Sequence, residues 1–144
     1  MKRALIPIAF AAALAGCSTA TQSSGPAVEM HLTGSNLEAN RLYSPGPIEA
    51  VLQLTVNNPT AQPITLRSLE LQTVATNSFQ LRSEIVVNKT IPPNSAATLT
   101  LSTWGRSRGG HLAGEEPITI RGKGYFDALS GGFVKIFVDM VVPR

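Results

Sequence analysis

The sequence predicts an all-β protein whose main domain is an immunoglobulin-like β-sandwich of about seven strands. Short runs of valine, isoleucine, leucine and threonine are separated by glycine, proline and asparagine, at the spacing of strands joined by turns. No segment shows a sustained helical periodicity of apolar residues. These two observations favour a sandwich over a fold that contains helices.

Seven segments have the composition of strands. The second of them stops at Asn58 and Pro59, because proline removes a donor from the ladder and asparagine favours a turn. Residues 91–95 contain two prolines and are expected to connect strands, and Gly131 marks the last hairpin. The predicted strands lie at 28–33, 52–56, 64–74, 79–88, 97–104, 117–126 and 134–142.

The last strand has the clearest alternation in the chain, typical of a strand with one buried face. One face is uniformly apolar, whereas the opposite face mixes charged and apolar residues and is expected to be half covered. The first face consists of Val134, Ile136, Val138, Met140 and Val142, and the second of Phe133, Lys135, Phe137, Asp139 and Val141.

The first 16 residues have the organisation of an export signal. A basic start precedes an apolar run over 4–14, which is too short to span a bilayer as a permanent helix. The run ends in Leu14-Ala15-Gly16-Cys17, which resembles the lipobox of bacterial lipoproteins. The resemblance implies cleavage before Cys17, a diacylglycerol on its thiol and a further acyl chain on the new amino terminus. Two or more acyl chains anchor a protein stably to a membrane.

After cleavage, residues 17–27 are predicted to form the lipidated cysteine and a flexible tether, and 28–144 the sandwich domain. The tether is small and polar, and fully extended it holds the domain roughly 30 Å from the lipid surface at about 3.3 Å per residue. In Gram-negative lipoproteins an aspartate after the cysteine favours the inner membrane. Ser18 stands there instead, which predicts the outer membrane, facing the periplasm, in such a host.

The charge of the mature chain is close to balanced. Cleavage removes Lys2 and Arg3 and leaves ten basic against nine acidic side chains, so net charge gives little support for a nucleic-acid or acidic-lipid partner. Residues 121–126 have the basic and aromatic composition of one strand of RNA-recognition modules, but the helices of that module are missing. No nucleic-acid partner is therefore predicted.

The order of features from about 48 to 143 resembles the water-stress and hypersensitive-response domain, the LEA-14-like family. An apolar strand ends in Asn58-Pro59, a proline-rich connection leads into an alternating strand at 98–101, and a closing strand at 133–143 ends at proline. The stretch 105–116 departs from the family's strand pattern. The resemblance implies a domain without known catalytic residues, associated with stress protection and with binding of apolar or unfolded partners.

The candidate binding residues are Trp104, Arg106, Arg108 and His111, which are interspersed with glycines. Arginine side chains bind anions in a bidentate manner, and the backbone N–H groups of glycine-rich turns can form anion-binding nests. The alternative interpretation is a solvated loop between two strands.

Catalytic and metal sites are not predicted. His31 and His111 are far apart in the sequence, and no second histidine or free cysteine stands at ligand spacing. Glu115 and Glu116 are adjacent, so on a strand they point to opposite faces. No Gly-x-Ser-x-Gly motif of a serine hydrolase occurs. We therefore expect no enzymatic activity, no metal and no cofactor.

Two classes of function follow. The first is a non-enzymatic envelope lipoprotein that presents an edge strand, or the stretch 104–111, to an envelope partner in a binding, structural or stress-protective role. The second is an accessory subunit or an enzyme with a small-ligand site near 105–116. In that case Arg106, Arg108, His111 and Glu116 would surround a pocket.

Overall fold

The computed structural model describes residues 25–37, 39–74, 79–110 and 116–143. It contains seven strands and one helical turn, and every predicted strand is present. Cys17 and His111 lie outside the described residues. The elements are β1 (Glu29–Asn36), α1 (Ala39–Leu42), β2 (Gly46–Asn58), β3 (Ile64–Thr73), β4 (Phe79–Ile91), β5 (Ser95–Ser107), β6 (Ile118–Ala128) and β7 (Gly131–Val141).

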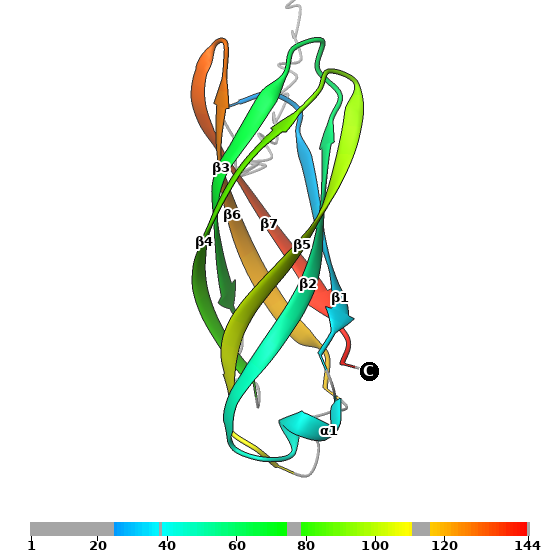
Figure 1. The fold of residues 1–144 in the computed structure, drawn as a ribbon, viewed down its shortest axis with the longest axis vertical. Coiled ribbons are helices and arrows are strands. Elements are labelled where there is room, and N and C mark those ends of the chain that lie inside the picture. Colours follow the sequence, from blue (N-terminus) through cyan, green and yellow to red (C-terminus); the bar gives the residue numbers. More distant parts are fainter. Residues whose placement is uncertain (1–24, 38, 75–78, 111–115, 144) are drawn as a thin grey trace, which may run out of the picture.

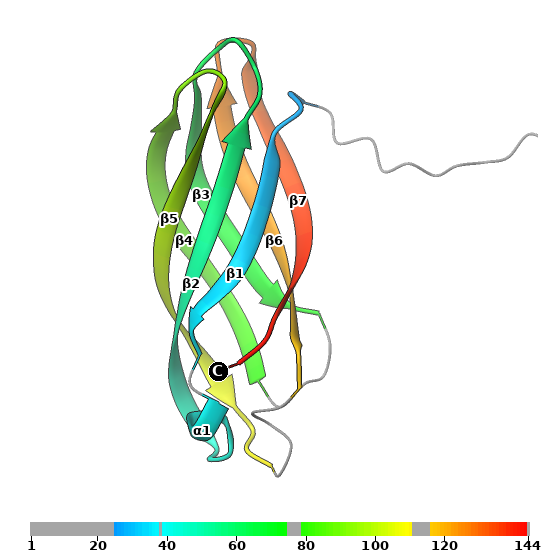
Figure 2. The same cartoon turned by 90° about the vertical axis from the view of Figure 1, so that its right-hand side faces the viewer.

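The strands form two antiparallel layers. Their hydrogen-bonded order is β1-β2-β5-β4-β3-β6-β7. β4 pairs with β5 only from Phe79 to Leu81 and then continues along β3, so β1-β2-β5 form one layer and β4-β3-β6-β7 the other (Figures 1 and 2). In an immunoglobulin constant domain the first, second, fifth and fourth strands adjoin, as do the third, sixth and seventh. The same pairs adjoin here, but β4 also pairs with β3 along most of its length, which joins the two layers into one continuous sheet. The structure thus confirms the predicted all-β fold of seven strands.

The elongated sandwich has two distinct ends. The connections β2–β3, β4–β5 and β6–β7 gather at one of them, called here the hairpin end, and α1 lies at the other, the α1 end (Figure 1). No helix among the described ranges is long and apolar enough to cross a membrane.

The core lies between the layers and follows the predicted alternation in most strands. Leu52, Leu54 and Val56, which share one face of β2, are buried. β6 contributes Ile118, Ile120 and Phe126, whose ring stacks on Phe133 of β7 with centroids 5.0 Å apart. Because alternate residues of a strand point to opposite faces, each strand contributes one row of side chains to this core.

The prediction for the last strand was wrong about which face is buried. The uniformly apolar face of β7 points outward: Ile136 is 48% exposed, Val138 57%, Met140 71% and Val142 59%. The mixed face points inward, with Phe133 and Val141 buried and Phe137 packed against the core.

Side-chain volume explains this orientation of β7. The phenylalanine rings fill more of the space between the layers than valine would, and β6 makes room for one of them with a glycine. The ring of Phe137 occupies the place that a Cβ on Gly122 would need. Asp139, one of the two charged residues of the inward face, lies at the seam with the other layer and contacts β1 there.

A carboxylate connects the two layers at that seam. β1 runs beside β7 (Figure 2), but along their described lengths no backbone ladder joins them. Instead, Leu32 N of β1 donates a hydrogen bond of 2.7 Å to Asp139 Oδ2, and His31 Nδ1 lies 4.0 Å from Asp139 Oδ1. Asp139 thus replaces a missing ladder partner.

Asp139→Ala is expected to lower the free energy of unfolding by about 2 kcal/mol, because it leaves the Leu32 N–H without its acceptor. Urea unfolding followed by circular dichroism measures this loss. Asp127→Ala is the matched control: its carboxylate pairs at 3.3 Å with exposed Arg67, and an exposed ion pair contributes less than about 1 kcal/mol. Equal losses for the two variants would contradict the role given to Asp139.

Asn58 organises the connections at the hairpin end. Its side chain is fully buried, and Nδ2 donates to the backbone oxygens of Gln62 and Pro92, each at 2.9 Å, and of Ile91 at 3.3 Å. Its Oδ1 accepts hydrogen bonds from Thr60 N and Thr60 Oγ1. One amide therefore connects the β2–β3 turn with the β4–β5 turn.

Candidate functional site at the α1 end

Trp104 is the most exposed aromatic side chain among the described residues, at 63%. It lies on β5, where the even-numbered residues from Thr98 to Arg106 are exposed and therefore face away from the core. Its neighbour across the ladder is Glu49 of β2, whose carboxylate accepts a hydrogen bond from Ser102 Oγ. The indole is thus held on a paired strand beside a carboxylate.

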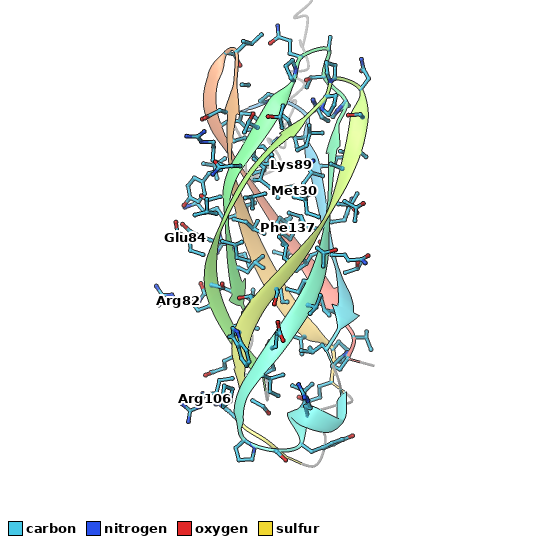
Figure 3. The ribbon with its side chains drawn as sticks, viewed as in Figure 1. Met30, Arg82, Glu84, Lys89, Arg106 and Phe137 are labelled. Carbon is cyan, nitrogen blue, oxygen red and sulfur yellow. The ribbon has the colours of Figure 1, made fainter. Side chains whose placement is uncertain are left out.

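Two arginines follow Trp104 on the same side of the molecule. Arg106 is exposed on the outer face of β5, between Pro47 of β2 and Gln80 of β4 (Figure 3). Arg108 is exposed immediately after the strand. Neither guanidinium forms an ion pair within the described parts of the chain, so both are available to an external group.

The chain after β5 is held by the segment around α1. Ser107 is buried. Its Oγ donates a hydrogen bond of 2.6 Å to Leu42 O and accepts one of 2.9 Å from Gly109 N. Gly110 N donates to Tyr43 O at 3.3 Å. The N–H groups of both glycines are therefore used inside the protein, and the binding capacity of this region comes from side chains.

These contacts define one surface, called here the α1-end surface: Tyr43, Trp104, Arg106 and Arg108. Tyr43 joins it because its backbone contacts Gly110 and its side chain is 42% exposed. Sequence patterns identified three of the four residues but missed Tyr43, since α1 and its following turn were not predicted. His111, which the sequence also predicted for this site, lies outside the described residues.

Gly105 has a packing role. It is a residue of β5, and a Cβ at this position would overlap the ring of buried Phe79 and lie 2.9 Å from Gln80 O. β5 ends at Ser107, three residues beyond the end that the sequence predicted at Trp104. The first glycine of the predicted loop accommodates an aromatic ring of the core.

Tryptophan, tyrosine and arginine are the residue types that contribute most to binding energy at protein interfaces. They combine a large apolar surface with a hydrogen-bonding group. All three residue types are exposed in the α1-end surface. The β5 edge is paired with β4 from Gly105 to Ser107 and has no ladder partner from Trp104 toward the hairpin end, because β4 leaves β5 at Leu81. The arrangement suits recognition of a macromolecular surface.

The small-ligand alternative has less structural support. Arg106, Arg108 and Glu116 are exposed to solvent, and none of them borders the hollow found on the opposite layer of the described sandwich. In the described portion of the chain, no three histidine, cysteine, aspartate or glutamate side chains stand close enough to hold a metal ion.

That hollow, of about 740 Å³, lies on the outer face of the other layer, across β4, β3, β6 and the margin of β7. It is lined by Glu70, Leu71, Gln72, Arg82, Ser83, Glu84, Arg121, Lys123 and Ile136. Arg82 and Glu84 project outward from β4 (Figure 3). Because acidic and basic groups alternate across it, the hollow has no single strong charge.

Several charges of the hollow are already paired. Tyr125 Oη donates to Glu70 Oε1 at 2.5 Å, and Lys123 Nζ lies 4.8 Å from the centre of the Tyr125 ring. The hydrogen bond to Tyr125, assisted by the charge of Glu70, raises the pKa of Lys123. The sequence did not point to this surface, because its residues come from four strands that only the sheet brings together.

Comparison with known proteins adds evidence on the fold alone. No protein-family model and no curated protein matches the chain. The structure of SoR45, a target of the Northeast Structural Genomics Consortium, aligns with a TM-score of 0.60 and 15% identity over 81% of this chain and 87% of that one. This likeness agrees with the all-β fold.

Two further structures align less well. A protein from Archaeoglobus fulgidus has a TM-score of 0.47 and 19% identity, over 78% of this chain and 90% of that one. A FixG-related protein from Vibrio parahaemolyticus has a TM-score of 0.42 and 17% identity, over 81% of this chain and 96% of that one. With TM-scores below 0.5, neither carries an argument.

Proposed function

We propose that this protein is a non-enzymatic binding lipoprotein of the bacterial cell envelope, which presents its α1-end surface to a protein partner. The observation that carries the proposal is the exposure of Trp104, 63%, on a strand whose next outward residue is Arg106. Leaving an indole in water is unfavourable, whereas burying it with a guanidinium in an interface is a common source of affinity.

The anchor in this proposal is lipid on Cys17. Its support is the lipobox resemblance at 14–17. Gly25 packs against Phe133 at the start of β7, which is at the hairpin end of the sandwich. The lipid would therefore attach at the end opposite the α1-end surface and leave that surface accessible. Ser18 favours the outer membrane in a Gram-negative host.

Loss of the aromatic, or of the two arginines, is expected to weaken partner capture strongly. Membranes carrying the wild type, Trp104→Ala or the double variant Arg106→Ala with Arg108→Ala are crosslinked, and co-purified proteins are compared by mass spectrometry. A specific partner recovered with the wild type should fall at least about tenfold in both variants, since each replaces residue types that are hot spots of interfaces.

The matched control is Arg67→Ala, which removes an exposed arginine near the hairpin end and should keep the partner. Cys17→Ala tests the anchor separately and should move the protein from the membrane to the soluble fraction. If the partner survives loss of Trp104 and both arginines, or if no specific partner is captured in any form, the proposed binding surface is wrong. Suppression of client aggregation without defined stoichiometry would then favour the stress-protective role that the family resemblance implies.

A further inference from the structure

The outer face of β7 bears an apolar surface that the fold does not use. Ile136, Val138, Met140 and Val142, called here the β7 stripe, are between 48% and 71% exposed. They stand at every second position along β7 and the residue that follows its end, and therefore form a continuous row. Scattered apolar residues are normal on protein surfaces, but a contiguous apolar row indicates a surface that is covered in use.

Positive charges flank the β7 stripe along β6. Arg121 stands opposite Val138 in the ladder, and Lys123 stands opposite Ile136. Glu70 stands opposite Lys123 on the other side of β6 and attracts it, whereas Arg121 stands opposite the uncharged Gln72. An apolar row beside cationic side chains is the pattern of elements that lie in the interface of a bilayer, where the cations meet phosphate groups.

The position of Gly25 limits how far from β7 a lipid on Cys17 can lie. Gly25 packs on Phe133, at the first turn of β7, and β1 then runs beside β7. Cys17 precedes Gly25 by eight residues, which can span at most roughly 29 Å. The 11 residues of β7 extend for about 36 Å. The distance from a lipid on Cys17 to the start of β7 is therefore shorter than the length of β7.

We infer that the β7 stripe rests on the surface of the membrane to which Cys17 is anchored, with the sandwich lying along the bilayer. The inference rests on the lipid anchor of the proposed function and adds the orientation of the domain. The anchor makes the contact intramolecular, so a small apolar row is sufficient for docking. Trp104 and Arg106 lie on the outer face of the other layer and therefore point away from the lipid.

The single cysteine and the single tryptophan of the chain allow a direct test. The chain without residues 1–16 is coupled through Cys17 to vesicles of phosphatidylcholine and phosphatidylglycerol that contain a maleimide lipid. The quencher is a brominated phosphatidylcholine. Three proteins are compared: the wild type, Trp104→Phe with Val138→Trp, and Trp104→Phe with Val86→Trp.

Val86 is the matched control position. It is an exposed valine, 73%, on the outer face of the same layer but on β4, at the margin away from β7. The tryptophan introduced by Val138→Trp should emit at shorter wavelength on the vesicles and be quenched several-fold more strongly than the tryptophan of either other protein. Adding Ile136→Lys and Met140→Lys should reduce that quenching to the level of the controls.

Equal quenching in all three proteins, or none at position 138, would overturn the docking surface. A blue shift that grows with protein concentration before coupling, without quenching on the vesicles, would assign the β7 stripe to contact with a second copy of the protein. That outcome would also overturn docking on the membrane. Because the coupling uses the thiol chemically, the result does not depend on lipidation in the cell. Failure of the anchor is detected separately, by Cys17→Ala remaining in the membrane fraction.

Discussion

Asn58→Asp is expected to lower the free energy of unfolding by about 4 kcal/mol. The change is nearly isosteric, so its effect is electrostatic. It replaces the Nδ2 donor, which serves three backbone oxygens, with a carboxylate oxygen that faces the same acceptors. The side chain is fully buried, so water cannot solvate the new charge. Urea or thermal unfolding of the two proteins measures the difference.

Gln62→Glu provides the control for Asn58→Asp, because it makes the same amide-to-carboxylate change in the same connection at an exposed position. Its cost should stay below about 1 kcal/mol. Burial should also raise the pKa of the introduced aspartate, so that the penalty is fully present near neutral pH and shrinks as the pH falls and the group takes up a proton. A loss at position 58 as small as the loss at position 62 would show that the amide does not hold the two turns together.

The role of Asn58 also shows the limit of turn chemistry as a predictor. The sequence predicted a turn at Asn58 and Pro59, and the strand does end there. Local propensity explains why asparagine suits a turn, but it contains no information about Ile91 and Pro92, which are more than thirty residues away. The non-local half of the network becomes visible only when the β4–β5 turn lies against the β2–β3 turn.

The existence and approximate position of all seven strands were predictable, whereas the ends of β2 and β5 and the buried face of β7 were not. Alternation identifies two faces of a strand but assigns the core correctly only when one face is clearly more polar. In β7 the inward face contains two phenylalanines together with Lys135 and Asp139, and the outward face contains only aliphatic residues. Ring volume and the position of Asp139 at the seam decided the orientation, and both depend on neighbouring strands.

The candidate site was predictable in composition and only partly in structure. Trp104 and Arg106 were identified by residue type, because an aromatic and arginines interspersed with glycines suggested a site for an anionic group. The sequence placed Arg106 in a loop because glycines follow Trp104, but the strand continues through Gly105. The sequence does not distinguish a glycine that packing requires from one that a turn requires. At position 105 the distinction comes from the neighbouring Phe79 ring.

Gly105→Ala is accordingly expected to lower the free energy of unfolding by about 3 kcal/mol. The new methyl group would occupy the space of the Phe79 ring, which is 1% exposed and has no free volume into which it can move. The backbone oxygen of Gln80, 2.9 Å from the Cβ position, prevents the methyl group from moving away from the ring. Since Trp104 and Arg106 adjoin Gly105, the variant should also weaken partner capture.

The clash can be separated from a general intolerance of alanine by two further proteins. Gly132→Ala adds the same methyl group on β7, where the nearest atom is 3.5 Å away, and should change the free energy of unfolding by less than about 1 kcal/mol. Phe79→Leu shortens the opposing side chain, so in combination with Gly105→Ala it should cost clearly less than the sum of the two single changes. Strictly additive losses would mean that the ring is not what excludes a side chain at position 105, and the packing account of this strand would have to be abandoned.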